Sequence, residues 1–406
     1  MKTKPFSAIR PAPEVVSKLA CVPYDVVDSA EAKALVADND VSVLHVSRPD
    51  VDLPDGIDIY SDAVYDQASK ALASLIDRGA LFKDKDPAYY LYRQIMGKHS
   101  QTGLVACCNI DDYANNVIRK HEKTRQDKED DRTRHVLKSN ANTGPVFILY
   151  RDQKEIDAVV EKVVAQEPLY DFTADDGIRH TVWKVPGDGS RLRDLFGQVP
   201  VSYIADGHHR AKAAFRAGME RRAENANHTG DEEYNWFLAV LFPASQLRVL
   251  PYNRCVSSLN GLSPETFLEK VSKVFTTEKT DNPVPAGERH ANMYLGGSWY
   301  ALSWPAFEAD PVSSLDVSVL QQRLLAPILG IADPRTDKRI SFVGGIRGTK
   351  ELENRVDSGR DVVAFSMAPV TVEQLIAIAD AGEIMPPKST WFEPKLRSGL
   401  FVHEII

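Results

Sequence analysis

Apolar positions recur along this chain with two different periods, which together predict helices interleaved with strands. Between residues 61 and 81, a set of apolar side chains recurs every three to four positions and forms one face of an amphipathic helix: Val64, Ala68, Leu72, Leu75 and Ile76. Short apolar runs such as VFILY, RHTVWKV and WFLAVLF predict strands instead. Because strands and helices alternate throughout, we expect an α/β or α+β fold.

We predict the domain organisation of the chain from its length and from changes in composition along the sequence. Its 406 residues are enough for about two or three domains. We expect an N-terminal α/β part over residues 1–115, a core over residues 116–260 and a C-terminal α/β part over residues 261–406. The sequence contains neither an internal repeat nor a low-complexity linker.

The composition of the chain indicates which class of protein it belongs to and which kinds of partner it can have. With 43% hydrophobic and 26% charged residues, the chain is typical of globular proteins. Its net charge of −8 lacks the diffuse basic field of a nucleic-acid binder, so we expect no nucleic-acid partner. The start of the chain has no apolar signal core, and no apolar run reaches the roughly 18 residues of a membrane span. We therefore expect a cytoplasmic protein without a membrane partner.

The stretch VSYIADGHHRAKAAFRAG, residues 201–218, places charged and polar residues where a predicted strand runs into an alanine-rich helix. The first N–H groups of such a helix lack partners and carry the positive end of its dipole, so an anion is favoured there. Gly207 removes the β-carbon that would hold a phosphate off the backbone, and Arg210 adds a cationic fork suited to phosphate. The predicted phosphate- and nucleotide-binding residues of this corner are Gly207, His208, His209 and Arg210.

Asp206 would repel a bare phosphate, so its presence at a predicted phosphate site indicates a further role for this carboxylate. We expect it to hold a Mg²⁺ ion against the phosphates or to take a proton from an attacking hydroxyl. In the alternative, Asp206 only caps the helix, which leaves the two histidines and the arginine after Gly207 unexplained. A zinc site is disfavoured, because adjacent histidines cannot easily both reach one ion and no further ligand is near in sequence.

The sequence IADGHHR at the start of a helix resembles the signature of the ParB/sulfiredoxin-like superfamily, in its branch of free serine kinases. In that branch a histidine–glutamate pair precedes the corner, and its glutamate is the catalytic base. Here VIRKHEKT supplies His121 and Glu122. The resemblance implies a ParB/sulfiredoxin-like core with large N-terminal and C-terminal additions, and it makes Glu122 the predicted base. The related DNA-binding proteins carry a helix-turn-helix domain after this core, and the sequence has no such segment.

The whole chain also resembles a larger bacterial family of unknown function that is built on the same core. The matching stretches are CVPYDVVDSAEAKALVADN, LHVSRPDVDLP, HEKTRQDKEDDRTRH, YIADGHHRAKAA and MPPKSTWFEPKLRSGL. They run from near the N-terminus almost to the C-terminus, so this second resemblance covers the additions as well as the core.

Two further polar segments are candidates for the same site. Arg125, Lys128 and Arg132 repeat at helical spacing, so one helix face could meet phosphates, or the helix could be a solvated one laced with ion pairs. Residues 386–399 are stiffened by prolines, and we expect them to fold over the Asp206 corner as a lid. In the alternative, this segment only packs its tryptophan and phenylalanine. Its predicted phosphate-binding residues are Lys388, Ser389 and Thr390, and Lys395 and Arg397 line the same loop.

Together these residues predict a nucleotide-dependent phosphotransferase that acts on a small hydroxyl metabolite, as a serine kinase does. Free serine or phosphoserine is the expected substrate, ADP or ATP the expected nucleotide and Mg²⁺ the expected metal, and the direction of transfer and the oligomeric state stay open. Arg210 would hold phosphate while Asp206 or Glu122 accepts the hydroxyl proton. One alternative is a nucleotide-binding switch without turnover, which has no use for Glu122. Another is a phosphoserine-type phosphatase, in which water replaces the nucleotide.

Overall fold

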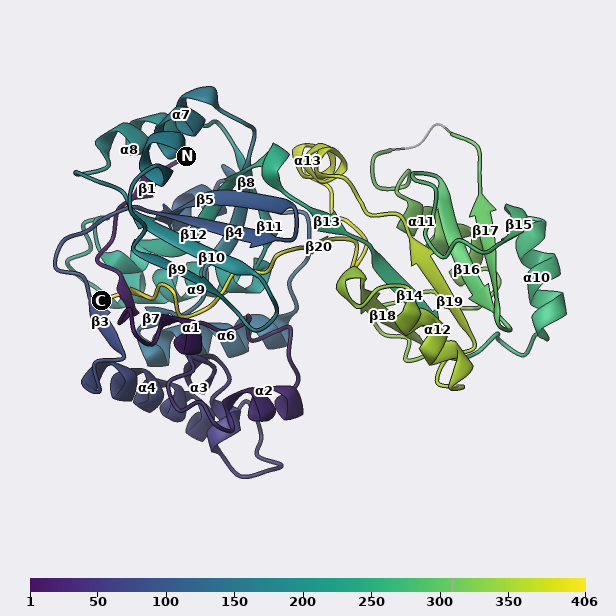
Figure 1. The fold of residues 1–406 in the computed structure, drawn as a ribbon, viewed down its shortest axis with the longest axis horizontal. Helices are drawn as coiled ribbons and strands as arrows, with labels where there is room; N and C mark the ends of the chain where they lie inside the picture. Colours follow the sequence, from purple (N-terminus) through teal and green to yellow (C-terminus); the bar gives the residue numbers. More distant parts are fainter. Residues whose placement is uncertain (308–309) are drawn as a thin grey trace. The chain divides into compact units, whose positions relative to one another are not determined.

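Figure 1 shows the computed structural model of the chain, which describes residues 1–307 and 310–406. The internal contacts of the chain divide it into two units. The first unit comprises Met1–Leu247 and Pro394–Ile406, and the second comprises Arg248–Glu393. Strands and helices are mixed in both units, which confirms the predicted α/β class.

These units are divided differently from the three parts expected from the sequence. The boundary expected near residue 115 lies within the first unit, and the boundary expected near residue 260 lies within the second, which begins at Arg248. The last residues of the chain return to the first unit. Changes in composition along the sequence do not reveal such a return, because it depends on packing between residues that are distant in sequence.

A mixed sheet of nine strands forms the centre of the first unit. Its strands are β1 (Thr3–Lys4), β4 (Tyr90–Met96), β5 (His99–Asn109), β6 (Ile118–Arg119), β8 (Val146–Tyr150), β9 (Tyr170–Thr173), β10 (Arg179–Lys184), β11 (Ser202–Asp206) and β12 (Trp236–Pro243). Their order is β6-β11-β8-β12-β5-β4-β10-β9, and β1 pairs with β5 outside this path. β11 runs parallel to β6 and β12 runs parallel to β8, while the other neighbours are antiparallel.

The first unit also contains helices and 3₁₀ turns. They are α1 (Val16–Leu19), α2 (Ser29–Val36), α3 (Leu44–Ser47), α4 (Asp62–Asp77), α5 (Ile110–Ala114), α6 (Gln126–Ser139), α7 (Lys154–Val164), α8 (Ser190–Gly197), α9 (His208–Glu224) and the 3₁₀ turns η1 (Pro49–Asp52), η2 (Glu233–Asn235) and η3 (Ala244–Gln246). All five residues of β8 are buried, as expected of a strand covered on both faces. One core cluster joins such strand residues to Ile156 of α7, Phe196 of α8 and Ala211 of α9.

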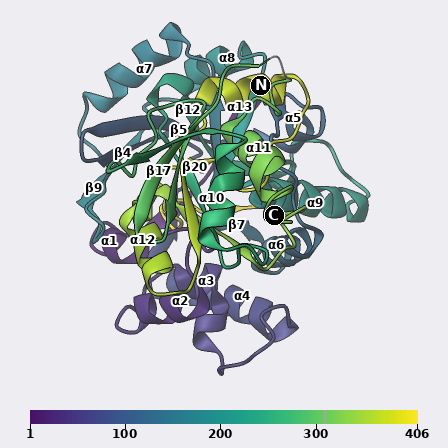
Figure 2. The ribbon, with the colours of Figure 1, turned by 90° about the vertical axis from the view of Figure 1, so that its right-hand side faces the viewer.

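The helix α4 confirms the helix predicted from the apolar period between residues 61 and 81. Val64, Ala68, Leu72 and Leu75 are all buried along one side of it. The prediction is wrong for Ile76, which is 38% exposed near the end of the helix. Figures 1 and 2 both show α4 grouped with α2 and α3 at one end of the first unit. These helices form a second apolar cluster, so the N-terminal part of the chain packs as a layer of its own.

Two short sheets attach the ends of the chain to the first unit. β2 (Ile9–Pro11) pairs with β3 (Leu81–Lys83), and β21 (His403–Glu404) pairs with β7 (Ala141–Asn142). The backbone of Ser398 also bridges to Cys21. These pairings fix the position of the C-terminal segment within the unit.

The second unit is built on a six-stranded antiparallel sheet. The strands of the second unit are β13 (Val249–Leu250), β14 (Tyr252–Val256), β15 (Thr276–Thr280), β16 (His290–Leu295), β17 (Ser298–Ser303), β18 (Ile340–Gly344), β19 (Val363–Met367) and β20 (Trp391–Phe392). The order in the sheet is β15-β17-β16-β19-β14-β18, and β13 pairs separately with β20. The helices are α10 (Pro264–Ser272), α11 (Asp316–Leu320), α12 (Lys350–Asp357), α13 (Val372–Asp380), the π-helical η4 (Gln321–Leu325) and the 3₁₀ turn η5 (Gly345–Arg347).

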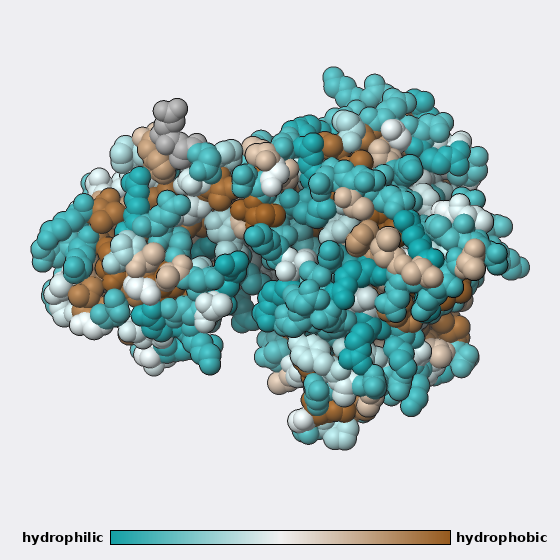
Figure 3. All heavy atoms as spheres, turned by 180° about the vertical axis from the view of Figure 1, so that it is seen from behind, coloured by the Kyte–Doolittle hydropathy of each residue, from teal (hydrophilic) through white to brown (hydrophobic). Residues whose placement is uncertain are grey.

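The surface of the chain is mainly polar. On the face drawn in Figure 3, hydrophilic residues, coloured teal, cover most of the surface. Within the residues that the structure describes, every helix is too short or too polar to cross a bilayer. The cytoplasmic location stays a prediction.

Three buried histidines in the first unit predict that mild acid weakens folding. Burial lowers the pKa of His135 to about 4 and that of His180 to about 3, and it also lowers the pKa of His403. The folded chain keeps these rings neutral, whereas the unfolded chain protonates them below about pH 6.5. The free energy of unfolding should therefore fall between about pH 6.5 and pH 5, by up to about 1.4 kcal/mol per pH unit for each ring. Urea unfolding across this range measures the slope.

Asp316 in the second unit acts in the opposite direction. Burial raises the pKa of its carboxyl group to about 6, so the folded chain keeps a proton that the unfolded chain has lost. Burial also raises the pKa of Asp157. Five buried histidine rings act in the other direction, so the net trend is still a loss of stability on acidification. A free energy of unfolding that stays constant or rises between about pH 6.5 and pH 5 would contradict this account.

Candidate functional site

The corner between β11 and α9 turns at Gly207. Its φ of +89° lies in the left-handed region that glycine adopts without strain. A β-carbon on Gly207 would lie 3.0 Å from both Cζ and Nε of Arg210. The glycine therefore does two things: it makes the turn, and it lets the Arg210 guanidinium fold back over the start of the helix.

Two cations contact Asp206 at this corner. Lys395 Nζ and Arg210 Nη2 each lie 3.4 Å from Asp206 Oδ2. Burial raises the pKa of the Asp206 carboxyl group, but the charges of Lys395 and Arg210 outweigh this effect and hold the pKa well below its usual value. Asp206 is therefore a carboxylate at neutral pH, and two positive charges surround its single negative charge.

Lys395 comes from the C-terminal segment that the sequence predicted to fold over the corner. The Lys395 carbonyl accepts a hydrogen bond of 2.8 Å from Nε2 of Gln94, and the Gln94 side chain is itself fixed by Gln101. Both glutamines are fully buried. The position of Lys395 beside Asp206 is therefore set by the sheet below it.

The other predicted ligands of that segment belong to the second unit. Lys388 Nζ lies 5.5 Å from the centre of the Tyr252 ring, and Ser389 donates a hydrogen bond to the carbonyl of Pro386. Thr390 directly precedes β20. Phosphate binding by Lys388, Ser389 and Thr390 stays a prediction.

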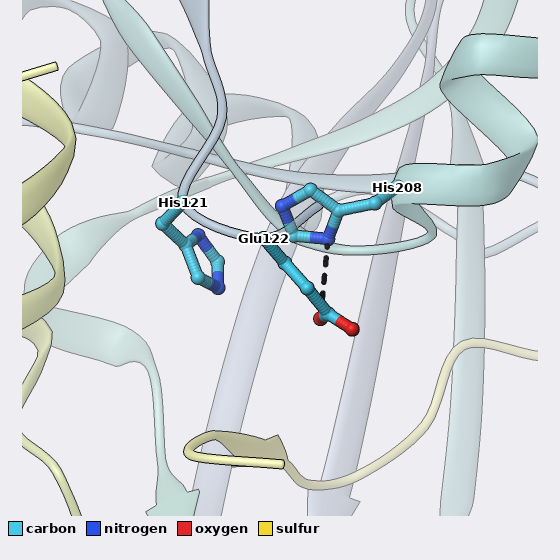
Figure 4. Close-up of side chains that lie close together, drawn as sticks. All are labelled: His121, Glu122 and His208. Atoms are coloured by element: carbon cyan, nitrogen blue, oxygen red, sulfur yellow. Dashed lines mark ion pairs between the residues drawn. The ribbon is translucent and has the colours of Figure 1, made fainter. Parts of the chain in front are cut away.

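The histidine–glutamate pair and the corner occupy one place in the fold. His121 and Glu122 lie in the loop between β6 and α6, and β6 pairs in parallel with β11. Glu122 Oε2 lies 3.8 Å from Nδ1 of His208, and the rings of His121 and His208 are nearly perpendicular with centroids 4.5 Å apart. Figure 4 shows the three side chains converging from the two segments.

His121 and His208 are buried histidines with unused polar atoms. Burial lowers the pKa of His121 well below its usual value and that of His208 to about 3. Both ring nitrogens of His121 and Nε2 of His208 lack a hydrogen-bond partner among the described residues. The backbone of Ile204 draws the pKa of His121 slightly upwards but forms no aligned hydrogen bond with the ring. Both rings are therefore neutral at neutral pH.

The remaining predicted residues are divided between the corner and the neighbouring helix. His209 Nε2 accepts a hydrogen bond of 3.1 Å from the backbone N–H of Arg125, which ties the start of α9 to the start of α6. The Arg125 guanidinium pairs with Asp127 on the surface. Lys128 donates a hydrogen bond of 2.9 Å to the hydroxyl of Tyr60. The structure thus brings the backbone of Arg125 to the corner, while the ammonium group of Lys128 is held by a tyrosine.

A cavity of about 40 Å³ adjoins the corner. The cationic and hydroxyl-bearing side chains that line it are Tyr24, Ser47, Arg132, Thr143, Arg210 and Ser398. Arg210 connects the cavity to Asp206, because it lines the one and contacts the other. One water molecule needs about 10–15 Å³ of cavity volume measured in this way. The cavity therefore accommodates a few waters or one small group such as a carboxylate.

A model of the family described as "Protein of unknown function (DUF1015)" matches residues 3–318. The chain belongs to this family. The resemblance to a family of unknown function is thereby confirmed for most of the chain, whereas the ParB/sulfiredoxin-like core stays a prediction. A search of curated proteins gives no match to this DUF1015 protein.

Several solved structures are similar to this DUF1015 protein at low identity. A conserved hypothetical protein from Pyrococcus furiosus is 13% identical, and the match covers 73% of this chain and 95% of that chain with a TM-score of 0.36. A free serine kinase in complex with AMP is 13% identical, with 73% and 92% covered and a TM-score of 0.36. SbnI with a C-terminal truncation, from Staphylococcus aureus, is 10% identical, with 72% and 85% covered and a TM-score of 0.37. TM-scores this low give no information about the function of this chain.

About half of the residues that line the cavity lie in the sequence stretches that resemble the family, and one of them, Arg132, was already a candidate for phosphate binding. Tyr24, Ser47, Arg132 and Ser398 come from four different stretches, yet all of them line the cavity beside the corner. Thr143 lies outside them all. The position of these residues within the matching stretches was the available signal, but the sequence alone does not show that they converge.

The contact between Lys395 and Asp206 should stabilise the first unit. Lys395→Met keeps the apolar stem but removes the charge, so the pKa of Asp206 should move back towards its usual value. We expect the free energy of unfolding to fall by about 1–2 kcal/mol, because the pair is largely shielded from water. Urea unfolding at neutral pH measures the change.

Lys83→Met is the matched control for Lys395→Met. Lys83 pairs with Glu404 on the surface, where its side chain is 53% exposed. Such surface pairs contribute less than about 1 kcal/mol. If the free energy of unfolding falls equally in the two variants, the contact between Lys395 and Asp206 stabilises the chain no more than a surface ion pair does.

Proposed function

We propose that this protein is a nucleotide-dependent phosphotransferase that acts on a small hydroxyl metabolite, with a ParB/sulfiredoxin-like core and an activity similar to that of free serine kinases. The observation that supports the proposal is the position of Glu122 beside the start of α9. Phosphoryl transfer needs an anion-binding site and an aligned proton acceptor at one place. The corner provides the first and Glu122 the second.

The phosphates of ADP or ATP are proposed to bind at the start of α9. Its first turn has the sequence HHRA, without an acidic residue, so the N–H groups and the helix dipole favour an anion. Gly207 presents no β-carbon, and Arg210 and Lys395 add positive charge. The further proposed phosphate ligands are His208, His209, Arg125, Lys128, Lys388, Ser389 and Thr390.

Mg²⁺ is the proposed metal of the transfer, with Asp206 as its ligand. The depressed pKa of Asp206 keeps it ionised, and its side chain is 28% exposed, so it offers the carboxylate oxygen that Mg²⁺ prefers. In phosphoryl transfer the ion commonly uses one or two carboxylates together with phosphate oxygens and water. When bound, the ion would neutralise charge that develops on the phosphates.

Glu122 is the proposed base. Its side chain is 40% exposed, so an acceptor molecule can approach it, and Nδ1 of His208 lies 3.8 Å from its Oε2. In the transfer, the acceptor hydroxyl oxygen bonds to the terminal phosphorus of the nucleotide, the bond from that phosphorus to the bridging oxygen breaks, and the hydroxyl proton passes to Glu122. A positioned base is worth roughly 10²–10⁴-fold in rate.

The cavity beside the corner supports a small carboxylic acid as the acceptor. Two of its lining side chains are the guanidinium groups of Arg132 and Arg210, which suit a carboxylate. Arg210 Nε is buried without a hydrogen-bond partner among the described residues, so one donor is available there. Serine carries a carboxylate and a hydroxyl on one small molecule. The same contacts would hold phosphoserine if transfer runs in the reverse direction.

The exchange Glu122→Gln tests the role of the base. It keeps the size and polarity of the side chain but removes the proton acceptor, so turnover should fall by about tenfold to a hundredfold or more while nucleotide affinity holds. The measurement is the rate of phosphoserine formation from serine with ADP or ATP. The matched control is Glu224→Gln at the other end of α9, whose turnover should not change. If Glu122→Gln turns over normally, Glu122 is not the base.

The exchange Arg210→Ala tests the phosphate site. We expect nucleotide affinity to fall by about 2 kcal/mol or more, which is the usual cost of losing a charge-assisted contact. Calorimetric titration with ADP and ATP measures the change, and circular dichroism confirms that the fold is intact. Arg221→Ala, near the C-terminal end of the same helix, is the control. Equal affinity in the parent and in Arg210→Ala would refute the predicted phosphate site.

A further inference from the structure

His121, Glu122 and His208 form a group that the proposed phosphotransferase uses only in part. A ring nitrogen from each histidine and a carboxylate oxygen of Glu122 all lie within 4.8 Å of one another. We propose that these three side chains bind one divalent transition-metal ion of the zinc class. This site goes beyond the phosphotransferase, in which Mg²⁺ is assigned to Asp206.

The distances between the side chains suit a small ion after a modest movement. Zinc binds imidazole nitrogen and carboxylate oxygen at about 2.0–2.2 Å, which puts ligand atoms of a tetrahedral site about 3.4 Å apart. The separation between Glu122 Oε2 and His208 Nδ1 is already 3.8 Å. Glu122 is the most exposed of the three side chains and lies in a loop, so it can close the remaining gap.

The buried ring nitrogens are the independent observation that points to a ligand. Both ring nitrogens of His121 and Nε2 of His208 have no hydrogen-bond partner among the described residues. A buried polar atom without a partner costs about 1–3 kcal/mol. By contrast, the other buried histidines have partners: His135 contacts the carbonyl of Val46, His180 the hydroxyl of Tyr92, and His403 both Asn142 and Glu233. Because each imidazole binds an ion through one nitrogen, a metal ion would satisfy at least one nitrogen of His121 that the fold leaves unused.

The chemistry of the three side chains selects the class of metal. Two imidazole nitrogens and one carboxylate oxygen favour Zn²⁺, Co²⁺ and similar ions over Mg²⁺ and Ca²⁺, which prefer oxygen ligands. Three protein ligands leave a further position for water or substrate, as in catalytic zinc sites.

The fold supplies candidate ligands that the sequence argument against zinc did not consider. That argument considered only the adjacent histidines and the residues near them in sequence. His209 is directed to the backbone of Arg125 instead. Its place is taken by His121 and Glu122, which the pairing of β6 with β11 brings to His208.

The proposed ion would share Glu122 with the proposed phosphotransferase. A carboxylate oxygen that coordinates a metal cannot accept a proton at the same time. Metal binding and base catalysis by Glu122 are therefore alternative states of the site. Metal binding can be measured without nucleotide or acceptor, so its failure and the failure of the phosphotransferase are separate results.

Titration of the chelator-treated full chain with Co²⁺ tests the site. We expect one equivalent to bind and to produce visible absorption bands typical of low coordination number, and Zn²⁺ should displace it. His208→Ala and His121→Ala should each weaken Co²⁺ binding by at least about a hundredfold, the upper end of what removal of a supporting group around a metal costs. His209→Ala is the matched control, because it removes the neighbouring imidazole, and it should keep the parent affinity.

Glu122→Gln keeps the test decisive if a buried-histidine variant fails to fold, because Glu122 is partly exposed. It should weaken Co²⁺ binding and shift the absorption bands while circular dichroism is unchanged. Absence of a Co²⁺ band and of Zn²⁺ binding heat in the parent chain would overturn the proposal. Loss of affinity in His209→Ala equal to that in His208→Ala, or parent affinity in Glu122→Gln, would overturn it as well.

Discussion

The parallel pairing of β6 with β11 is the constraint on which the candidate site depends. Its register sets Ile118 opposite Ser202 and Arg119 opposite Tyr203. Parallel strands end at the same edge of a sheet, so the residues that follow them emerge side by side. Glu122 follows Arg119 by as many residues as Asp206 follows Tyr203, which brings two motifs that are distant in sequence to one edge.

The local charge around Asp206 at this edge of the sheet differs in sign from the net charge of the chain. The chain carries a net charge of −8, yet Asp206 is contacted by both Lys395 and Arg210, and the helix start adds further positive potential. Two buried histidines beside them are held neutral, so they add no repulsion against these cations. The result is a small region of positive charge on an acidic protein, which is the charge balance that the proposed phosphate site requires.

Local pattern predicted the parts of this molecule that depend on neighbours in sequence. The helix of Val64, Ala68, Leu72 and Leu75 and the turn at Gly207 follow from periodicity and from backbone freedom. Family resemblance assigned Glu122 to the corner, and the fold confirms that the two lie together. The sequence also predicted that residues 386–399 approach the Asp206 corner. The specific side-chain pairs could not be predicted, among them Lys395 with Asp206 and His121 with His208, because they depend on tertiary packing.

The most direct test of the central claim is to follow a labelled terminal phosphoryl group from nucleotide to serine. The purified chain would be incubated with Mg²⁺, serine and either ADP or ATP labelled at the terminal phosphate, and the products would be separated. The account predicts labelled phosphoserine that depends on the enzyme and on serine. Label that stays on the nucleotide, or that appears only as inorganic phosphate with both nucleotides, would contradict it.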